Sequence, residues 1–322
     1  MFGAEPGKKT QQIGFFLVPE FSMIAFASAV EPLRLANRVS EDTLYTGSTY
    51  SFDGQPVTAS NGIPVIVDGA IAEAEKLDIV FVCSGVHAHK YCDKGLLTRL
   101  RRMASHGTDI GALCTGTHIL AKAGLLEDSR CTIHWENLTA FTEEFLDIDV
   151  TSELFEIDRN RYTCAGGTAA VDLMLNLIAL HVGSNVAATI ADEMIHHRIR
   201  DGHEAQRMEL RSRLGVAHPK LLAVIQLMEE NLEETLSCAE LATSVGLSTR
   251  QLERLFRKYL NSAPTRYYVE LRLKRARFLL RQTSLPILSV ALAAGFVSAS
   301  HFSKCYREHF NRTPSEERRA AA

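Results

Sequence analysis

The residues around Cys114 have the types and the spacing to support thiol chemistry. From Ile110 to Thr117 the chain reads Ile-Gly-Ala-Leu-Cys-Thr-Gly-Thr, an apolar run followed at once by small and hydroxyl residues. This pattern predicts a strand that turns directly into a helix, a sharp turn known as a nucleophile elbow. The elbow places the cysteine beside unpaired N–H groups at the helix start. Such a position lowers the pKa of a thiol and can hold an anionic group. His134 and Trp135 lie about twenty residues further along.

Four roles are open to Cys114: the wall of a small-molecule pocket, the nucleophile of an amidase or hydrolase, a redox sensor, or a buried filler. We favour the pocket, because ligands of parallel α/β sheets bind at the carboxyl ends of the strands. Trp135 is the only tryptophan, and its ring could hold a quaternary ammonium by cation–π attraction or pack as a core aromatic. The residues predicted to line this pocket are Ser84, Gly85, Cys114, Thr115, His134 and Trp135.

A second set of side chains could contact DNA, and it occurs twice in the sequence. The segments 241–264 and 290–314 carry apolar residues at matching spacing, and each ends in proline. A glycine stands at corresponding positions, Gly246 and Gly295, which are 49 residues apart. A repeat of this kind indicates a duplicated structural unit. An ordinary helical bundle would explain one such segment. Two copies at a fixed separation favour a tandem reader, that is, two DNA-reading units in one chain.

Each copy is predicted to form a helix, a tight turn and a second helix. The glycine accepts the positive φ of the turn, and Ser248 or Ser298 caps the second helix. Apolar residues at helical spacing, such as Leu252 and Phe302, face inward. The opposite face carries polar and basic side chains that could reach base edges and phosphates in a major groove. The predicted DNA contacts are Thr249, Arg250, Glu253, Arg254, Ser300, His301 and Lys304.

The segment between the two copies is predicted to be one basic helix. Residues 265–281 lack glycine and proline, and a helix of about 17 residues spans roughly 25 Å. The second helix of each copy is its predicted DNA-reading helix. The length of the connecting helix could set these two reading helices about one DNA turn apart, ~34 Å. Its basic side chains suit phosphate contacts; they are Arg266, Arg272, Lys274, Arg275, Arg277 and Arg281.

The charge of the chain is distributed unevenly. Residues 217–322 hold 16 Lys and Arg against 10 Asp and Glu, whereas residues 1–216 hold 19 against 28. A basic C-terminal part joined to an acidic part indicates that one half binds nucleic acid. The seven cysteines favour a reducing compartment. Without an apolar leader in residues 1–12 or an apolar run long enough to span a bilayer, we expect a soluble cytoplasmic protein that makes no membrane contact.

The N-terminal part alternates apolar strands with helices, which predicts a mostly parallel sheet covered on both faces. Strands are expected at 13–18, 63–67, 77–82, 109–113 and 162–164, and helices between and after them. We therefore predict an α/β parallel-sheet sandwich at 10–198, a charged linker at 199–217, and an all-α tandem helix-turn-helix domain at 218–319.

Both parts resemble known families. Residues 220–319 resemble the DNA-binding domain of the AraC/XylS family, whose signature is matched by Gly295-Phe296, Ser298, Phe302, Phe310 and Thr313-Pro314. Glu317 departs from it, because the family usually has an aromatic residue there. Residues 13–195 resemble the class I glutamine amidotransferase-like (PfpI-like) fold, which is flavodoxin-like. The two together, in this order, resemble the GlxA-type transcriptional regulators.

This resemblance implies a sequence-specific DNA-binding transcriptional regulator, expected to be an activator. The expected partners are double-stranded DNA, RNA polymerase, a second copy of the chain and a small nitrogenous metabolite such as arginine, betaine or carnitine. Related enzymes carry His directly after the elbow Cys and an acid on the first helix, where this chain has Thr115 and Ala25. We therefore expect no catalysis. No cofactor or metal is expected either, because the pairs His87/His89 and His196/His197 lack a third ligand at supporting spacing.

Overall fold

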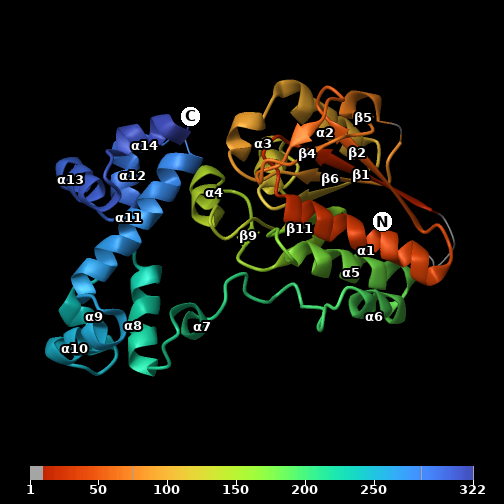
Figure 1. Ribbon diagram of the computed structural model, residues 1–322. Helices are drawn as coiled ribbons and strands as arrows, with labels where there is room; N and C mark the ends of the chain where they lie inside the picture. The colour runs from red at the N-terminus through yellow and green to blue at the C-terminus, as the bar shows by residue number, and fades with distance from the viewer. Residues whose placement is uncertain (1–9, 75, 284, 322) are drawn as a thin grey trace. The chain divides into compact units, whose positions relative to one another are not determined.

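The computed structural model describes residues 10–74, 76–283 and 285–321, in two compact units divided between Gln206 and Arg207 (Figure 1). The segment 199–217, which we predict to be the linker, falls in both units. Residues 202–206 hydrogen-bond to the first unit, for example through Leu154 N–H, which donates to Gly202 O at 2.9 Å. Residues from Arg207 onward include the short helix α7 (Leu210–Leu214) of the second unit.

The first unit is built on a mainly parallel sheet. Among the described residues its strand order is β10-β11-β7-β6-β1-β2-β5, and each neighbouring pair is parallel except β10 with β11. The central strands are apolar and buried, as a parallel sheet covered by helices requires. The strands are β1 (Gln11–Leu17), β2 (Tyr45–Ser51), β5 (Gly69–Ala70), β6 (Ile79–Cys83), β7 (Asp109–Leu113), β10 (Phe155–Asp158) and β11 (Arg161–Cys164).

Helices cover both faces of this sheet (Figure 1). On one face α1 (Met23–Ser40), α5 (Ala169–Val182) and α6 (Ser184–Glu193) bury one apolar cluster. On the other, α2 (Lys94–Ser105), α3 (Gly116–Lys122) and α4 (Leu138–Glu144) bury a second. Phe15 belongs to the first cluster and Phe16 to the second, because successive side chains of a strand point to opposite faces. The predicted flavodoxin-like α/β fold class is confirmed.

Two details of the sheet differ from the prediction. The apolar run 63–67 contributes only β4 (Pro64–Val65), which pairs antiparallel with β3 (Val57–Thr58) in a separate two-stranded sheet. The place beside β1 is taken by β2, a polar segment that carries no apolar run. Six residues of β2 align in register with β1, so backbone pairing rather than side-chain burial defines this strand. A further short sheet joins β8 (Cys131–Thr132) and β9 (Val150–Thr151).

The second unit is all helical and contains the two predicted helix-turn-helix copies. Gly246 and Gly295 have φ of 65° and 73°, the left-handed conformation that each turn was predicted to require. The Ser248 and Ser298 side chains accept the N–H groups of Gln251 and His301, which confirms the predicted caps. The helices are α8 (Pro219–Glu230), α9 (Cys238–Ser244), α10 (Thr249–Leu260), α11 (Pro264–Gln282), α12 (Ile287–Ala293), α13 (Ala299–Phe310) and α14 (Pro314–Ala321).

Candidate functional site

Cys114 occupies the predicted elbow between β7 and α3. Its φ is 60°, a left-handed conformation that is unusual for a residue with a side chain. Neighbouring glycines permit this turn: a Cβ on Gly116 would collide with Val82 O, and a Cβ on Gly166 would lie 2.7 Å from the Cys114 Cβ. The Cys114 N–H donates to Cys164 O at 2.9 Å, which ties the elbow to the adjacent strand β11.

The electrostatic prediction for the Cys114 thiol was wrong. A position at a helix start was expected to lower its pKa, but burial raises the pKa of Cys114 to about 12. The residue is only 8% exposed, and a buried thiolate loses its hydration. The N–H of Thr115 acts in the opposite direction, and it is outweighed. Ala25, at the position where related enzymes have an acid, is buried in the same apolar cluster as Cys114.

Ser84, Gly85 and Thr115 lie at the same sheet edge as Cys114, as predicted. The Thr115 hydroxyl donates to Gly85 O at 2.6 Å, and Ser84 N–H donates to Leu113 O at 3.5 Å. Ser84 and Thr115 are 1% and 4% exposed. These side chains are therefore packed, and a ligand can contact them only if the surrounding loops rearrange.

His134 and Trp135 belong to the loop after β8, which comes close to the elbow. The carboxylate of Glu136 in this loop contributes to the raised pKa of Cys114. The rings of His134 and Trp135 lie 5.6 Å apart, and Trp135 is 40% exposed. Burial lowers the pKa of His134, and the nearby Glu136 only partly offsets this, so the imidazole is neutral at pH 7.

A hydrogen-bonded chain connects the elbow helix to the end of the first unit, and the sequence analysis missed it. The Thr117 hydroxyl, on α3, donates to Thr132 O at 2.8 Å. The Gln206 side-chain amide donates to Thr132 Oγ1 and Ile133 O, both at 3.0 Å, and to Glu153 O at 2.8 Å. Gln206 lies in a charged segment and belongs to no motif or repeat, so the sequence pattern could not have indicated this role.

Neither a metal site nor a membrane-spanning helix is found in the part of the chain that the structure describes. There, no group of three or more His, Cys, Asp or Glu side chains is arranged to hold a metal ion. Nor is any helix among those residues both long and apolar enough to cross a bilayer.

The seven predicted DNA contacts are all exposed on α10 and α13. They lie opposite the buried residues Leu252 and Phe256 of the first copy and Phe302 and Tyr306 of the second. They are Thr249, Arg250, Glu253, Arg254, Ser300, His301 and Lys304.

The turn before α13 presents an apolar side chain that the sequence analysis did not single out. Val297 is 96% exposed and directly precedes the cap Ser298. An apolar group at this place could contact a thymine methyl in the major groove.

Most arginines of α11 have partners within the second unit, and the expectation that they contact phosphates stays a prediction. Arg272 donates to Ala294 O at 2.9 Å and to Gly295 O at 2.6 Å, just beyond the end of α12. Arg275 donates to Ala293 O at 3.2 Å. The reason is that the last carbonyls of α12 lack helical partners and carry partial negative charge, which a guanidinium satisfies.

Glu317 explains how this sequence departs from the AraC/XylS signature. Its carboxylate is fully buried and accepts hydrogen bonds from Arg277 at 3.1 Å and Arg281 at 2.6 Å. Burial alone would raise the pKa of Glu317, but the two guanidinium groups outweigh it and leave the pKa lowered. Charge pairing thus joins α14 to α11 at the position where the family has an aromatic residue.

Comparison with known proteins matches both parts of the chain. Residues 12–180 match the DJ-1/PfpI family and residues 241–320 match a helix-turn-helix domain family. The chain is 47% identical to the HTH-type transcriptional regulator GbdR of Pseudomonas aeruginosa, over 97% of this chain and 85% of that protein. It is 36% identical to the HTH-type transcriptional regulator GlxA of Rhizobium meliloti, over 99% of each. The crystal structure of an AraC family transcriptional regulator from Pseudomonas putida is also similar, with a TM-score of 0.53 and 28% sequence identity. The match covers 57% of this chain and 99% of that one.

Proposed function

The chain belongs to the GlxA-type family of HTH-type transcriptional regulators, in which a DJ-1/PfpI domain is joined to an AraC-type helix-turn-helix domain, and from this premise we propose a role for each unit. As a regulator of this family it binds DNA. We propose that its first unit binds a small nitrogenous metabolite, such as arginine, betaine or carnitine, and that the bound form activates transcription. The exposed polar faces of the two capped reading helices carry the proposal for DNA contact.

The predicted ligand contacts remain Ser84, Gly85, Cys114, Thr115, His134 and Trp135. The 40% exposure of Trp135 supports this proposal, because a partly exposed aromatic ring can bind a cation and the loop that carries it also holds Glu136, whose charge acts on Cys114. The hydrogen-bonded chain through Gln206 offers a route by which a change at the elbow could alter the end of the first unit.

We further propose that the first unit does not catalyse a reaction. A thiol whose pKa is raised to about 12 is almost entirely protonated at neutral pH, and the nucleophile must be the thiolate. The apolar Ala25 cannot supply the missing acid. An amidase, a hydrolase or a thiol redox sensor is therefore not favoured.

The remaining proposals concern partners and place. We propose that the regulator acts as a homodimer, because one tandem reader covers only about two major-groove segments and specificity grows with more half-sites. Contact with RNA polymerase follows from the proposed role as an activator. A cytoplasmic location follows from both proposals, since DNA and polymerase are found there in bacteria, the organisms of the named relatives.

Replacing a reading-helix side chain should weaken DNA binding without unfolding either unit. Arg250→Ala and Lys304→Ala each remove an exposed cation, and a lost base or phosphate contact costs about 1–3 kcal/mol. Gel-shift affinity at fixed salt should therefore fall by roughly five- to a hundredfold. Arg34→Ala, an exposed arginine of the first unit paired with Glu31, is the matched control. Unchanged affinity in both reading-helix variants would contradict the assignment of these faces.

A further inference from the structure

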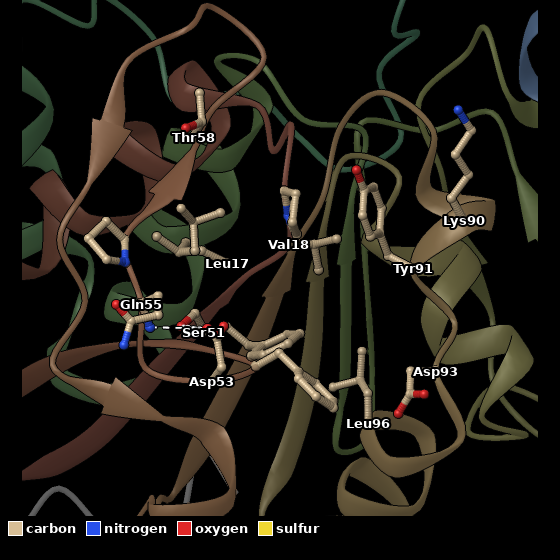
Figure 2. A pocket seen from close by; sticks show the side chains of 15 residues that line it. Leu17, Val18, Ser51, Asp53, Gln55, Thr58, Lys90, Tyr91, Asp93 and Leu96 are labelled. Atoms are coloured by element: carbon tan, nitrogen blue, oxygen red, sulfur yellow. Dashed lines mark hydrogen bonds between the residues drawn. The ribbon is translucent and has the colours of Figure 1, made fainter. Parts of the chain in front are cut away.

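A cavity of about 540 Å³ opens at the carboxyl ends of β1 and β2, among residues that no proposal above uses (Figure 2). It is lined by the end of β1, the loop after β2 and the segment around the 3-10 helix η2 (Ala88–Tyr91), which follows β6. In the sheet β1 lies between β2 and β6, so the chain leaves β1 to one side and later returns to the other. A crevice at such a switch of strand order is where open α/β sheets bind ligands.

The lining divides into an apolar floor and a polar rim. Phe16, Val18 and Leu96 are buried and form the floor. Two aromatic side chains also line the cavity: Tyr91 is half-buried, and Phe52 is 56% exposed although it is a large apolar group. A volume of about 540 Å³ falls within the range of about 300–1,000 Å³ typical of small-molecule sites, which also combine apolar walls with few polar groups.

The charges at the rim are mainly negative. Asp53 and Asp93 lie on opposite sides of the cavity (Figure 2). Each uses one carboxylate oxygen to accept a backbone N–H, from Gln55 at 3.1 Å and from Gly95 at 2.7 Å. These bonds fix both carboxylates in place without neutralising them. Lys90 is the cation in the lining.

A third carboxylate adds to this negative field. Burial raises the pKa of Tyr91, and the neighbouring Glu20 raises it further by its charge and by a hydrogen bond. Glu20 therefore lies beside the wall of the cavity. Two rim carboxylates and this adjacent one outnumber the single lysine, so the field at the rim favours a positive ligand.

We propose that this switch-point cavity is a small-molecule site, separate from the elbow, that takes a compact organic cation with an apolar body. The apolar part would rest on Phe16, Val18 and Leu96, and the cationic group would lie between Asp53 and Asp93. Phe52 and Tyr91 line the same cavity, and their rings would add cation–π attraction. The proposal goes beyond the function proposed above and does not depend on DNA binding.

Three probes of nearly equal shape test the charge preference on the full chain: choline, neutral 3,3-dimethylbutan-1-ol and anionic 3,3-dimethylbutanoate. Choline should bind saturably by calorimetry, and the neutral and anionic probes roughly tenfold more weakly or not at all. Asp53→Asn and Asp93→Asn should each weaken choline binding about two- to fivefold, as for an exposed ion pair. The asparagine side chain can still accept the Gln55 and Gly95 N–H groups, so both variants should remain folded.

Phe52→Ala, at an exposed position, should weaken choline binding by a similar factor. Leu146→Ala, at an exposed apolar position outside the cavity lining, should leave it unchanged. The site assignment is overturned if no probe binds, if the neutral probe binds as well as choline, or if neither Asp53→Asn nor Asp93→Asn weakens choline binding. A gel shift on the same variants should remain at the wild-type affinity, which separates this proposal from the DNA-binding function.

Discussion

At the scale of single residues, the elbow shows that local geometry does not determine reactivity. Cys114 has the left-handed conformation that presents a nucleophile in enzymes of related architecture. Its surroundings nevertheless favour the neutral thiol, because the side chain is packed among apolar groups. The same turn can thus surround a thiol that stays protonated at neutral pH.

The Cys114 thiol should be almost inert to iodoacetamide at neutral pH. With its pKa raised to about 12, compared with about 8.5 in an unfolded chain, the thiolate needed for alkylation forms only in strong alkali. The raised pKa also means that the free energy of unfolding falls as pH increases from about 8.5 toward 12. In that range the Cys114 thiol ionises in the unfolded chain but not in the folded one. Mass spectrometry of the alkylated protein resolves the modified positions. Modification of Cys114 at pH 7.5 as fast as a free cysteine would show that the burial argument fails.

At the scale of elements, the second unit is held together by charge at a place where an aromatic side chain is usual. Arg277 and Arg281 of α11 meet the buried carboxylate of Glu317 on α14. Removing one partner of a buried ion pair costs about 3–5 kcal/mol. The two arginine side chains are 34% and 43% exposed, so solvent screening reduces this figure, and we expect about 2 kcal/mol.

Glu317→Gln should therefore lower the free energy of unfolding of the second unit by about 2 kcal/mol at pH 7. The difference should shrink as pH falls, because the lowered pKa of Glu317 stabilises the fold above the unfolded pKa and this stability is lost as the carboxylate becomes protonated. Urea denaturation of both proteins at pH 7 and pH 3 measures this. Glu316→Gln, at the exposed neighbouring position, is the control and should lose less. Equal stability of Glu317→Gln and wild type at pH 7 would be inconsistent with a structural ion pair.

The elements that the sequence predicts well are those whose side chains repeat. Glycine, serine and apolar spacing were sufficient to predict both helix-turn-helix copies and their caps. The strand β2 could not be found in this way, because its polar residues are held by backbone pairing to β1. The basic residues of α11 are predicted to suit phosphate contacts, and the sequence did not indicate that Arg272 and Arg275 also satisfy carbonyls that only the folded unit brings near. Charge alone does not reveal whether an arginine has an internal partner.

At the scale of the whole molecule, the chain combines a first unit for which we propose ligand binding with a second unit that carries two helix-turn-helix copies. The charge asymmetry of the chain agrees with this division, because the Lys and Arg excess lies in the part that carries both helix-turn-helix copies. The predicted site residues at the elbow come from three separate segments. The parallel sheet brings the ends of β6 and β7 to one edge, whereas the loop with His134 and Trp135 follows β8, a strand of a separate two-stranded sheet. Their spacing in the sequence indicated the elbow, whereas their close packing could be known only from the fold.

The most direct test of the central claim is a hydroxyl-radical footprint of the full chain on an operator selected from random duplexes. Each tandem reader predicts a pair of protected segments about 10 base pairs apart, so the proposed homodimer predicts two such pairs. Arg250→Ala should weaken protection in one segment of each pair and Lys304→Ala in the other. A single protected segment, or loss of the same segment in both variants, would contradict a reader that uses both copies.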